Sequence, residues 1–305
     1  MKKSLIALAV VAASGAAMAQ SSVSVYGIAD IWVGKIKGSS AQAASGGVNT
    51  SRLGFKGSED LGGGLNANFQ FEEAIDLVNG ATQDKTFKRQ ANVGLSGGFG
   101  TVKLGRSWTA LDDVFGAANS GFDSALAANA VWQNGYTSAA DAQIYYATPS
   151  IAGFSAAIST QLNGNVAAGD DKTTSMNLQY ANGPIAAAVG YENAGFQKGT
   201  MLNGSYDLGA AKLLASYYTT KSDGGAKINS YQIGADIPLG SALTLSVGYA
   251  SSKTKGDSES DSAFGVAAAY SLSKRTMLYT GFRAEDRKAN GPDQDIFAFG
   301  VNHKF

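Results

Sequence analysis

Leu65-Asn-Ala-Asn-Phe-Gln-Phe-Glu72 alternates strictly between apolar and polar residues along its whole length. In an extended strand, successive side chains point to opposite faces of the sheet. Leu65, Ala67, Phe69 and Phe71 therefore share one face, and the other face is entirely polar. The segment predicts a β-strand that separates an apolar environment from a wet one.

This segment belongs to a hairpin unit that recurs along the chain. Ser51-Arg-Leu-Gly-Phe-Lys-Gly-Ser58 precedes it, and a Gly-rich turn over residues 59–64 joins the two. Seven short turns alternate with looser polar connections, and seven hairpins plus one strand at each end give sixteen strands. The turns lie near residues 58–64, 97–100, 149–153, 181–184, 207–210, 238–241 and 271–274, and the later connections near 163–171, 193–199, 221–226, 252–261 and 285–293.

The pattern predicts an all-β protein, for which a soluble β-sandwich is the alternative to a membrane barrel. A regular alternation of tight and long connections favours the barrel, as do aromatic residues near strand ends. The polar faces are rich in Gly, Ser and Asn and suit the lining of a lumen. Closure also removes sheet edges, which a bilayer requires because no water is present to satisfy open backbone groups.

The N-terminus has the features of a secretory signal peptide. Lys2 and Lys3 precede an apolar run over residues 5–13, and Ala17-Met18-Ala19 is a small-x-small cleavage site. We expect residues 1–19 to be removed and residues 20–305 to form one barrel domain. The mature chain then keeps 22 of the 24 basic residues against 24 acidic ones, so no basic excess points to nucleic acid.

One long interruption breaks the repeat. After Thr101-Val-Lys-Leu-Gly-Arg106, about 30 residues follow with no sustained period, and unstructured loops of this length are usually functional or disordered. Phe115, Phe122, Leu126 and Trp132 make this connection too apolar for a free tail. We expect it to fold inward and pack on the inner wall.

The sequence resembles the general diffusion porins of Gram-negative bacteria, of the β-proteobacterial type. The stretches that carry the resemblance are Val25-Tyr-Gly27, Ser51-Arg-Leu-Gly-Phe-Lys-Gly-Ser-Glu-Asp-Leu-Gly-Gly-Gly-Leu65, Arg89-Gln-Ala-Asn-Val-Gly-Leu95, Phe99-Gly-Thr-Val-Lys-Leu-Gly-Arg106 and Phe299-Gly-Val-Asn-His-Lys-Phe305. The resemblance implies a sixteen-stranded antiparallel transmembrane β-barrel with an inward-folded third loop, assembled as a homotrimer in the outer membrane. It implies a passive, water-filled channel for small hydrophilic solutes and ions.

The resemblance also suggests which residues line the narrowest part of the pore. Arg52 and Arg106 stand where the family places basic wall residues, Lys56 shares the face of Arg52, and Asp112 and Asp113 lie on the inward loop. Basic rings favour anions and acidic rings favour cations. The family commonly has a further Arg before the strand after the loop, but residues 135–141 contain none, so we expect weak selectivity.

The family resemblance implies three further kinds of partner and no cofactor. Phe305, at the end of an alternating strand, resembles the signal that the barrel-assembly machinery reads, and outer-membrane lipid and lipopolysaccharide would surround the barrel. The sequence has no Cys and a single His, which gives no support for a metal site, although calcium at trimer or lipopolysaccharide contacts stays open.

Two alternative functions remain. A substrate-specific channel would use Trp108 and Trp132 as solute contacts, although the sequence favours a simple packing role against the wall. A barrel hydrolase would need a His base or a Ser–His pair. His303 is the single histidine and shares the phase of Phe299 and Val301, which is the expected lipid face, so we predict that the protein is not an enzyme.

Overall fold

The computed structural model describes residues 22–162 and 172–305. The predicted signal peptide and the polar connection over residues 163–171 lie outside the described residues. The strands are β1 Ser22–Ile36, β2 Gln42–Ser45, β3 Arg52–Gly62, β4 Leu65–Ala74, β5 Gln90–Gly97, β6 Gly100–Trp108, β7 Ala139–Ala147, β8 Phe154–Gln161, β9 Thr174–Asn182, β10 Ile185–Asn193, β11 Gln197–Asp207, β12 Lys212–Ser222, β13 Lys227–Leu239, β14 Leu243–Thr254, β15 Asp261–Ser271, β16 Thr276–Arg287 and β17 Ile296–Lys304.

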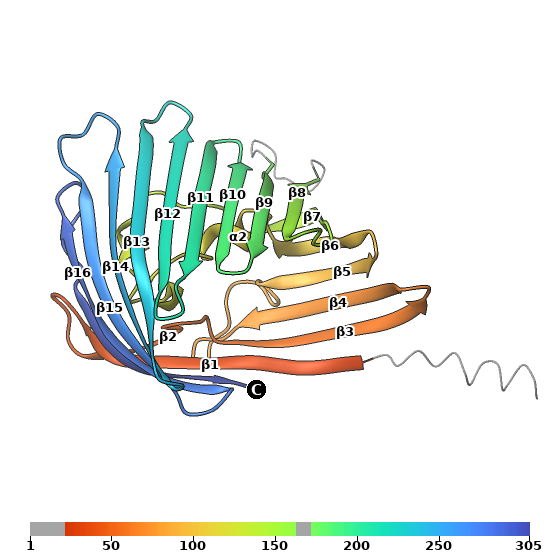
Figure 1. Ribbon diagram of the computed structural model, residues 1–305, viewed down its shortest axis with the longest axis horizontal. Coiled ribbons are helices and arrows are strands. Elements are labelled where there is room, and N and C mark those ends of the chain that lie inside the picture. The colour runs from red at the N-terminus through yellow and green to blue at the C-terminus, as the bar shows by residue number, and fades with distance from the viewer. Residues whose placement is uncertain (1–21, 163–171) are drawn as a thin grey trace, which may run out of the picture.

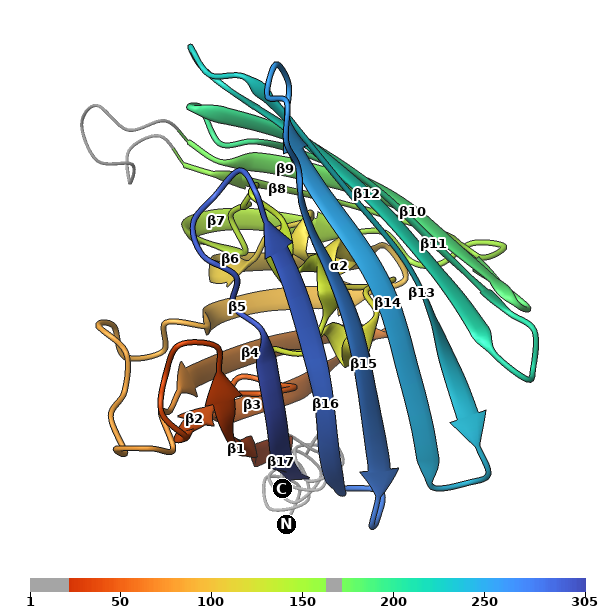
Figure 2. The same ribbon diagram turned by 90° about the vertical axis from the view of Figure 1, so that its left-hand side faces the viewer.

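The strands form one closed antiparallel sheet. Each strand from β3 onward pairs with its neighbours in sequence, and β1 closes the ring by pairing with both β3 and β17. Without the four-residue β2, which pairs only with β1 among the described strands, the barrel has sixteen strands, as predicted. Figures 1 and 2 show these strands as a tilted ring. The expected hairpin turns are confirmed, for example between β3 and β4 and between β13 and β14.

The two faces of the sheet differ as the alternation predicts. Apolar side chains on one face remain exposed, among them Val93 at 57%, Leu104 at 50% and Phe297 at 56%. Their neighbours on the other face are buried and small or polar, such as Asn92 and Ala298. Exposed apolar side chains over a closed sheet suit contact with lipid acyl chains. None of the described helices is long and apolar enough to cross a bilayer.

Backbone and side-chain hydrogen bonds close the seam between the two ends of the chain. Gly27 N donates to Phe305 O at 3.0 Å, and Phe305 N donates to Gly27 O at 3.1 Å. The buried carboxylate of Asp30 accepts from Tyr279 Oη at 2.6 Å and from Asn302 Nδ2 at 2.7 Å. It also accepts backbone N–H groups of the loop before β3, so one carboxylate ties together β1, β16, β17 and this loop.

Candidate functional site

The connection between β6 and β7 contains three short helices: α2 Asp112–Phe115, η1 Gly121–Asp123 and η2 Ala128–Val131. It packs against the side of the sheet opposite to the exposed apolar side chains. Its backbone N–H groups donate to serine hydroxyls of widely separated strands. Ala110 N lies 3.0 Å from Ser159 Oγ on β8, and Gly121 N lies 2.7 Å from Ser246 Oγ on β14.

Glycines on β10, β13 and β15 make room for this connection. A Cβ atom on Gly190 would lie 2.5 Å from Leu111 Cδ1, and one on Gly234 would lie 2.7 Å from Ser120 Cβ. A Cβ on Gly265 would lie 2.6 Å from the carbonyl oxygen of Leu126. Real Cβ atoms do not approach other heavy atoms so closely. Only glycine at these wall positions therefore leaves room for the connection to pack where it does.

Apolar side chains of the connection complete this packing. Leu111 and Val114 form a buried cluster with Met201 and Tyr218 of the wall. Phe115 stacks on Tyr136 with ring centroids 3.8 Å apart. The apolar residues of this connection therefore pack on the wall of the barrel.

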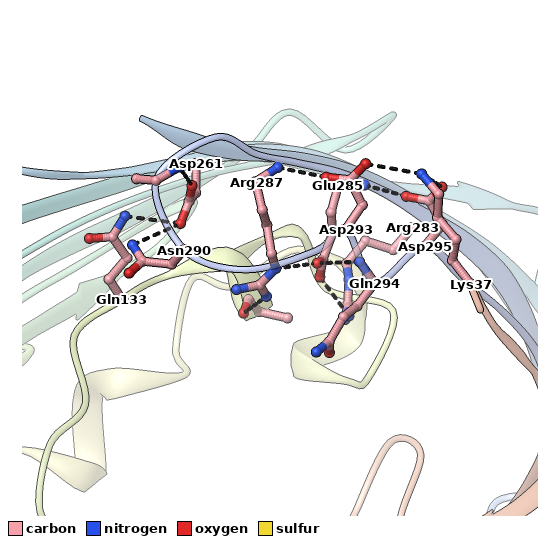
Figure 3. A network of polar contacts seen from close by, with 12 residues as sticks. Lys37, Gln133, Asp261, Arg283, Glu285, Arg287, Asn290, Asp293, Gln294 and Asp295 are labelled. Carbon is pink, nitrogen blue, oxygen red and sulfur yellow. Dashed lines mark hydrogen bonds and ion pairs between the residues drawn. The ribbon is translucent and has the colours of Figure 1, made fainter. Parts of the chain in front are cut away.

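An ion-pair network on β16 holds the opposite side of the connection (Figure 3). Glu285 accepts from Arg287 Nε at 2.5 Å, and its other oxygen lies 2.8 Å from Arg283 Nη2 in an ion pair. The same two arginines donate to carbonyl oxygens of the connection: Arg283 to Ala125, and Arg287 to Ala130 at 3.3 Å. The connection is thus fixed by hydrogen bonds on both sides.

Positively charged side chains form a cluster that faces the lumen. They are Arg52 and Lys56 on β3, Lys103 on β6 and Arg89 just before β5. Glu72 on β4 accepts from Arg89 Nε at 2.6 Å and lies 3.7 Å from Arg52 Nη1. Its other oxygen accepts from Tyr26 Oη at 2.8 Å. The Arg89 guanidinium also lies over the Trp108 ring, 4.7 Å from its centroid, which is a cation–π geometry. Two arginines thus share a single buried carboxylate and keep a net positive charge.

Two lysines extend this positive wall. Lys56 Nζ lies 5.1 Å from the centroid of the Tyr26 ring, and Lys103 Nζ lies 4.8 Å from that of Tyr145. Both line a recess of about 370 Å³ whose described lining residues include no carboxylate. Neither lysine forms an ion pair with a described residue.

Asp112 and Asp113, on α2, are hydrogen-bonded to tyrosines. Tyr136 Oη donates to Asp112 Oδ1 at 2.7 Å, and Tyr145 Oη donates to Asp113 Oδ2 at 2.7 Å. Burial raises the pKa of Asp112 to about 6, and the positive charge of Arg89 opposes this shift. Burial likewise raises the pKa of Asp113, and the positive charge of Lys103 opposes it. The acidic residues of the connection and the cations of the wall therefore act on one another electrostatically.

Arg106 has a different carboxylate partner from Arg52 and Arg89. It is in register with Ala91 of β5, on the face that it shares with Leu104, and its Nη1 lies 2.7 Å from Asp141 Oδ1. The register of β6 against β7 shifts beside it, at Gly105, where φ is +117°. Pairing of β6 with β5 continues through this shift, and Arg106 Nε donates to the carbonyl oxygen of Lys88.

Arg89, Lys103 and Glu72 complete the charged site, and the sequence did not single them out. Lys103 lies in an alternating strand whose phase could have identified it, since it shares a face with Thr101. Glu72 ends the polar face of the segment that predicted the fold. Arg89 begins the alternating run over residues 89–95, whose phase predicts the apolar face for it, but β5 begins only at Gln90, so this phase does not describe Arg89.

Comparisons with known proteins agree with the barrel fold. The family model described as Gram-negative porin matches residues 5–291. Outer membrane porin protein 32 of Delftia acidovorans is 36% identical over 310 residues, covering 92% of this chain and 88% of that protein. An outer membrane porin protein of Bordetella pertussis is 30% identical over 395 residues, covering 100% of this chain and 100% of that protein.

A solved structure gives the same result for the fold. The anion-selective porin from Comamonas acidovorans superimposes with a TM-score of 0.84 at 27% sequence identity, covering 94% of this chain and 100% of that chain. The family model, the relatives and the closed sixteen-stranded sheet agree on one assignment. This chain belongs to the Gram-negative porin family and is a passive channel protein of the outer membrane.

Proposed function

We propose that small hydrophilic solutes and ions pass between the positive wall and the connection that carries Asp112 and Asp113, and that this passage weakly favours anions. The observation that carries the proposal is the shared use of Glu72 by Arg52 and Arg89, which leaves one positive charge uncompensated. The relative from Comamonas is described as anion-selective. Here the two acidic residues oppose the cations and reduce the preference.

The connection between β6 and β7 is proposed to be the inward-folded third loop that sets the width of the channel. Its many contacts with β8–β16 support a fixed position rather than a mobile lid. Removal of residues 112–126 should raise single-channel conductance in planar bilayers. If a deletion variant that folds as a barrel conducts like the parent, the loop does not form the constriction.

The assembly is proposed to be a homotrimer. A cluster of aromatic rings on the outer side of β4, formed by Phe69 and Phe71 together with Phe87, supports a protein contact there. The ring centroids of Phe71 and Phe87 are 5.2 Å apart. Native mass spectrometry of the detergent-extracted protein would test the stoichiometry, and a monomer as the largest species would contradict it.

Phe305 is proposed to be read by the barrel-assembly machinery. Its side chain is 50% exposed on the outer face, although its backbone pairs with Gly27. The exposed Phe305 ring is accessible to a binding partner. Its backbone can form the hydrogen bonds with Gly27 afterwards, when the seam closes.

A channel without catalysis is the function that the interior supports best. His303 lies on the outer face, and its Nδ1 lies 2.9 Å from Thr276 Oγ1 rather than from an acid–base partner in the lumen. Trp108 lies against Arg89 and Trp132 against Phe115 and Tyr218, so both tryptophans have packing partners. A substrate-specific channel therefore has no separate observation in its favour among the described residues.

Two measurements on the purified protein test this function. Planar-bilayer recording should show ohmic steps, and liposome swelling with sugars of increasing size should show uptake that declines with solute size and does not saturate. Saturable uptake of one sugar alone would favour a substrate-specific channel. Absence of conductance from correctly folded protein would contradict the channel itself.

A further inference from the structure

A row of lysines lies on the outer face at one end of β11–β14. Lys198 of β11 is directly opposite Lys221 of β12, and Lys221 is directly opposite Lys227 of β13. Lys255, just after β14, donates its backbone N–H to the carbonyl oxygen of Lys227 at 2.7 Å, so the row continues to a fourth element. All four side chains are exposed. Lys253 lies beside them, opposite Asn229 of β13.

This arrangement is unfavourable in the isolated protein. Like charges directly opposite one another on neighbouring strands destabilise a sheet. Asp223, Asp257 and Glu259 lie in the adjoining loops, but no described carboxylate forms an ion pair with any lysine of the row. The row therefore concentrates positive charge without a counter-charge among the described residues.

Some lysines elsewhere on the exposed loops and strand ends are paired, whereas Lys212, Lys274 and Lys304 form no ion pair with a described residue. Lys85 lies 2.8 Å from Asp141, and Lys288 lies 3.1 Å from Asp286. Lys88 and Lys37 are also paired with aspartates. Exposure of lysine at the loops therefore does not by itself prevent ion pairing. The row on β11–β14 differs from the other unpaired lysines because its members lie directly opposite one another on neighbouring strands.

The depth of the row follows from the aromatic residues on the same face. Tyr217, Tyr231 and Tyr249 are exposed, and each lies four residues from a lysine of the same strand, namely Lys221, Lys227 and Lys253. Exposed tyrosines of membrane barrels mark the boundary between acyl chains and headgroups. Four residues of strand span about 13 Å, less when tilted, so the ammonium groups reach the headgroup layer.

The row faces the outer leaflet. It lies at the strand ends joined by the longer connections over residues 223–226 and 255–260, whereas the other ends of these strands meet in tight turns. In outer-membrane barrels the tight turns face the periplasm and the longer loops face outward. The partner must therefore be a component of the outer surface of the membrane.

We propose that this lysine row, Lys198, Lys221, Lys227 and Lys255, binds the phosphate groups of the phosphorylated glycolipid that forms the outer leaflet. Clusters of four or more basic residues beside a membrane bind anionic headgroups. The outward direction, the depth and the missing counter-charge each select a bilayer phosphate rather than a solute of the lumen. The site is independent of how the channel conducts.

The test compares two fourfold variants of the full mature protein. The row variant carries Lys198→Gln, Lys221→Gln, Lys227→Gln and Lys255→Gln. The matched control carries Lys37→Gln, Lys85→Gln, Lys88→Gln and Lys288→Gln, which removes the same charge from ion-paired positions. Binding of diphosphoryl lipid A in a zwitterionic detergent is measured by titration, and thermal unfolding is measured with and without the lipid.

The row variant should bind diphosphoryl lipid A at least about tenfold more weakly than the parent, while the control variant stays within about twofold. Without lipid, the row variant should unfold at a higher temperature than the parent, because repulsion between the lysines is gone. With lipid, the parent should gain more thermal stability than the row variant does. A fourfold Lys→Arg variant of the row should retain binding.

Three results would overturn the proposal. The row variant could bind as tightly as the parent, the control could lose binding equally, or the parent could bind a phosphate-free glycolipid as well as diphosphoryl lipid A. Heat-modifiable migration on gels verifies that each variant is a folded barrel. A row variant that does not fold is replaced by the pairs Lys198→Gln with Lys221→Gln and Lys227→Gln with Lys255→Gln.

Discussion

Arg89 Nε lies 2.6 Å from Glu72 Oε1, and this ion pair links the residue before β5 to β4 and, through Glu72, to Arg52. Glu72 is 3% exposed and is therefore held by its partners rather than by solvent. One carboxylate shared by two guanidinium groups both positions them and removes part of their charge. The strength of the proposed anion preference then depends on Glu72.

Glu72→Gln should increase the preference for anions. Loss of one negative charge beside the ion path should raise the anion-to-cation permeability ratio roughly two- to fivefold, because unit charges about 4 Å apart in water interact by about 1 kcal/mol. The measurement is the reversal potential under a KCl gradient. Glu73→Gln, one residue further on the same strand and paired with Leu53, is the control and should leave the ratio unchanged.

Gly248→Ala should disturb the packing of the connection between β6 and β7 against the barrel wall. A Cβ at Gly248 would collide with the side chain of Ser120, whose neighbour Gly121 is hydrogen-bonded to Ser246. Overpacking of this kind costs about 1–3 kcal/mol. Displacement of the connection toward the lumen should lower single-channel conductance, and Ser120→Gly in the same chain should restore it. Unchanged conductance in Gly248→Ala would show that the wall and the connection are not in tight contact.

Acidification should strengthen the preference for anions. Because burial raises the pKa of Asp112 to about 6, its carboxyl is mostly neutral at pH 5 and charged at pH 7.5. The same shift affects the free energy of unfolding. The raised pKa of Asp112 contributes stability that is fully present below the ordinary pKa of a carboxyl and is lost as the pH rises through about 6. The reversal potential should therefore shift toward anions between pH 7.5 and 5.

The Asp112→Asn variant separates this group from other titrating residues. It should behave at both pH values like the parent at pH 5, apart from the smaller contribution of Asp113, whose pKa is also raised. A parent whose reversal potential is the same at pH 5 and pH 7.5 would show that Asp112 does not act on the ion path.

Phe305→Ser should lower the amount of folded protein in the outer membrane without reducing synthesis. The Phe305 backbone pairs with Gly27 across the seam, and its ring lies over that glycine. Phe264→Ser is the matched control, because Phe264 is equally exposed at 50% but lies inside a strand. Heat-modifiable migration on gels measures the folded fraction, and equal losses in both variants would show that the terminal position has no special role.

The barrel was predictable because its signals are local. The alternation of Leu65–Glu72 and the short turns are properties of neighbouring residues, and they were sufficient for sixteen strands. Strand β2, Gln42–Ser45, lies within a Gly/Ser/Ala-rich stretch that has the composition of a loop, because small residues give no clear alternation. Its pairing with β1 is decided by tertiary structure.

The site was less predictable because its contacts join distant parts of the chain. Ser120 and Gly248 are far apart in sequence, and nothing near Gly248 indicates that a connection passes over it. Arg52 and the two aspartates follow from the family resemblance. The alternation of residues 89–95 would place Arg89 on the apolar face, but β5 begins at Gln90 and Arg89 does not follow that alternation. The resemblance also predicts Arg106 on the basic wall, whereas its contact with Asp141 joins residues 35 positions apart that no local pattern connects.

The reversal potential of the double variant Arg52→Glu, Arg89→Glu under a KCl gradient tests most directly whether the positive wall sets the ion preference. We expect a clear shift toward cations relative to the parent, because charges within about one Debye length of a passing ion, ~10 Å at 0.1 M salt, act on that ion. Arg106→Glu, which lies outside the cluster, should leave the reversal potential near that of the parent. A double variant that folds, inserts and keeps the parent's reversal potential would contradict this role of the wall, as would a shift caused by Arg106→Glu alone.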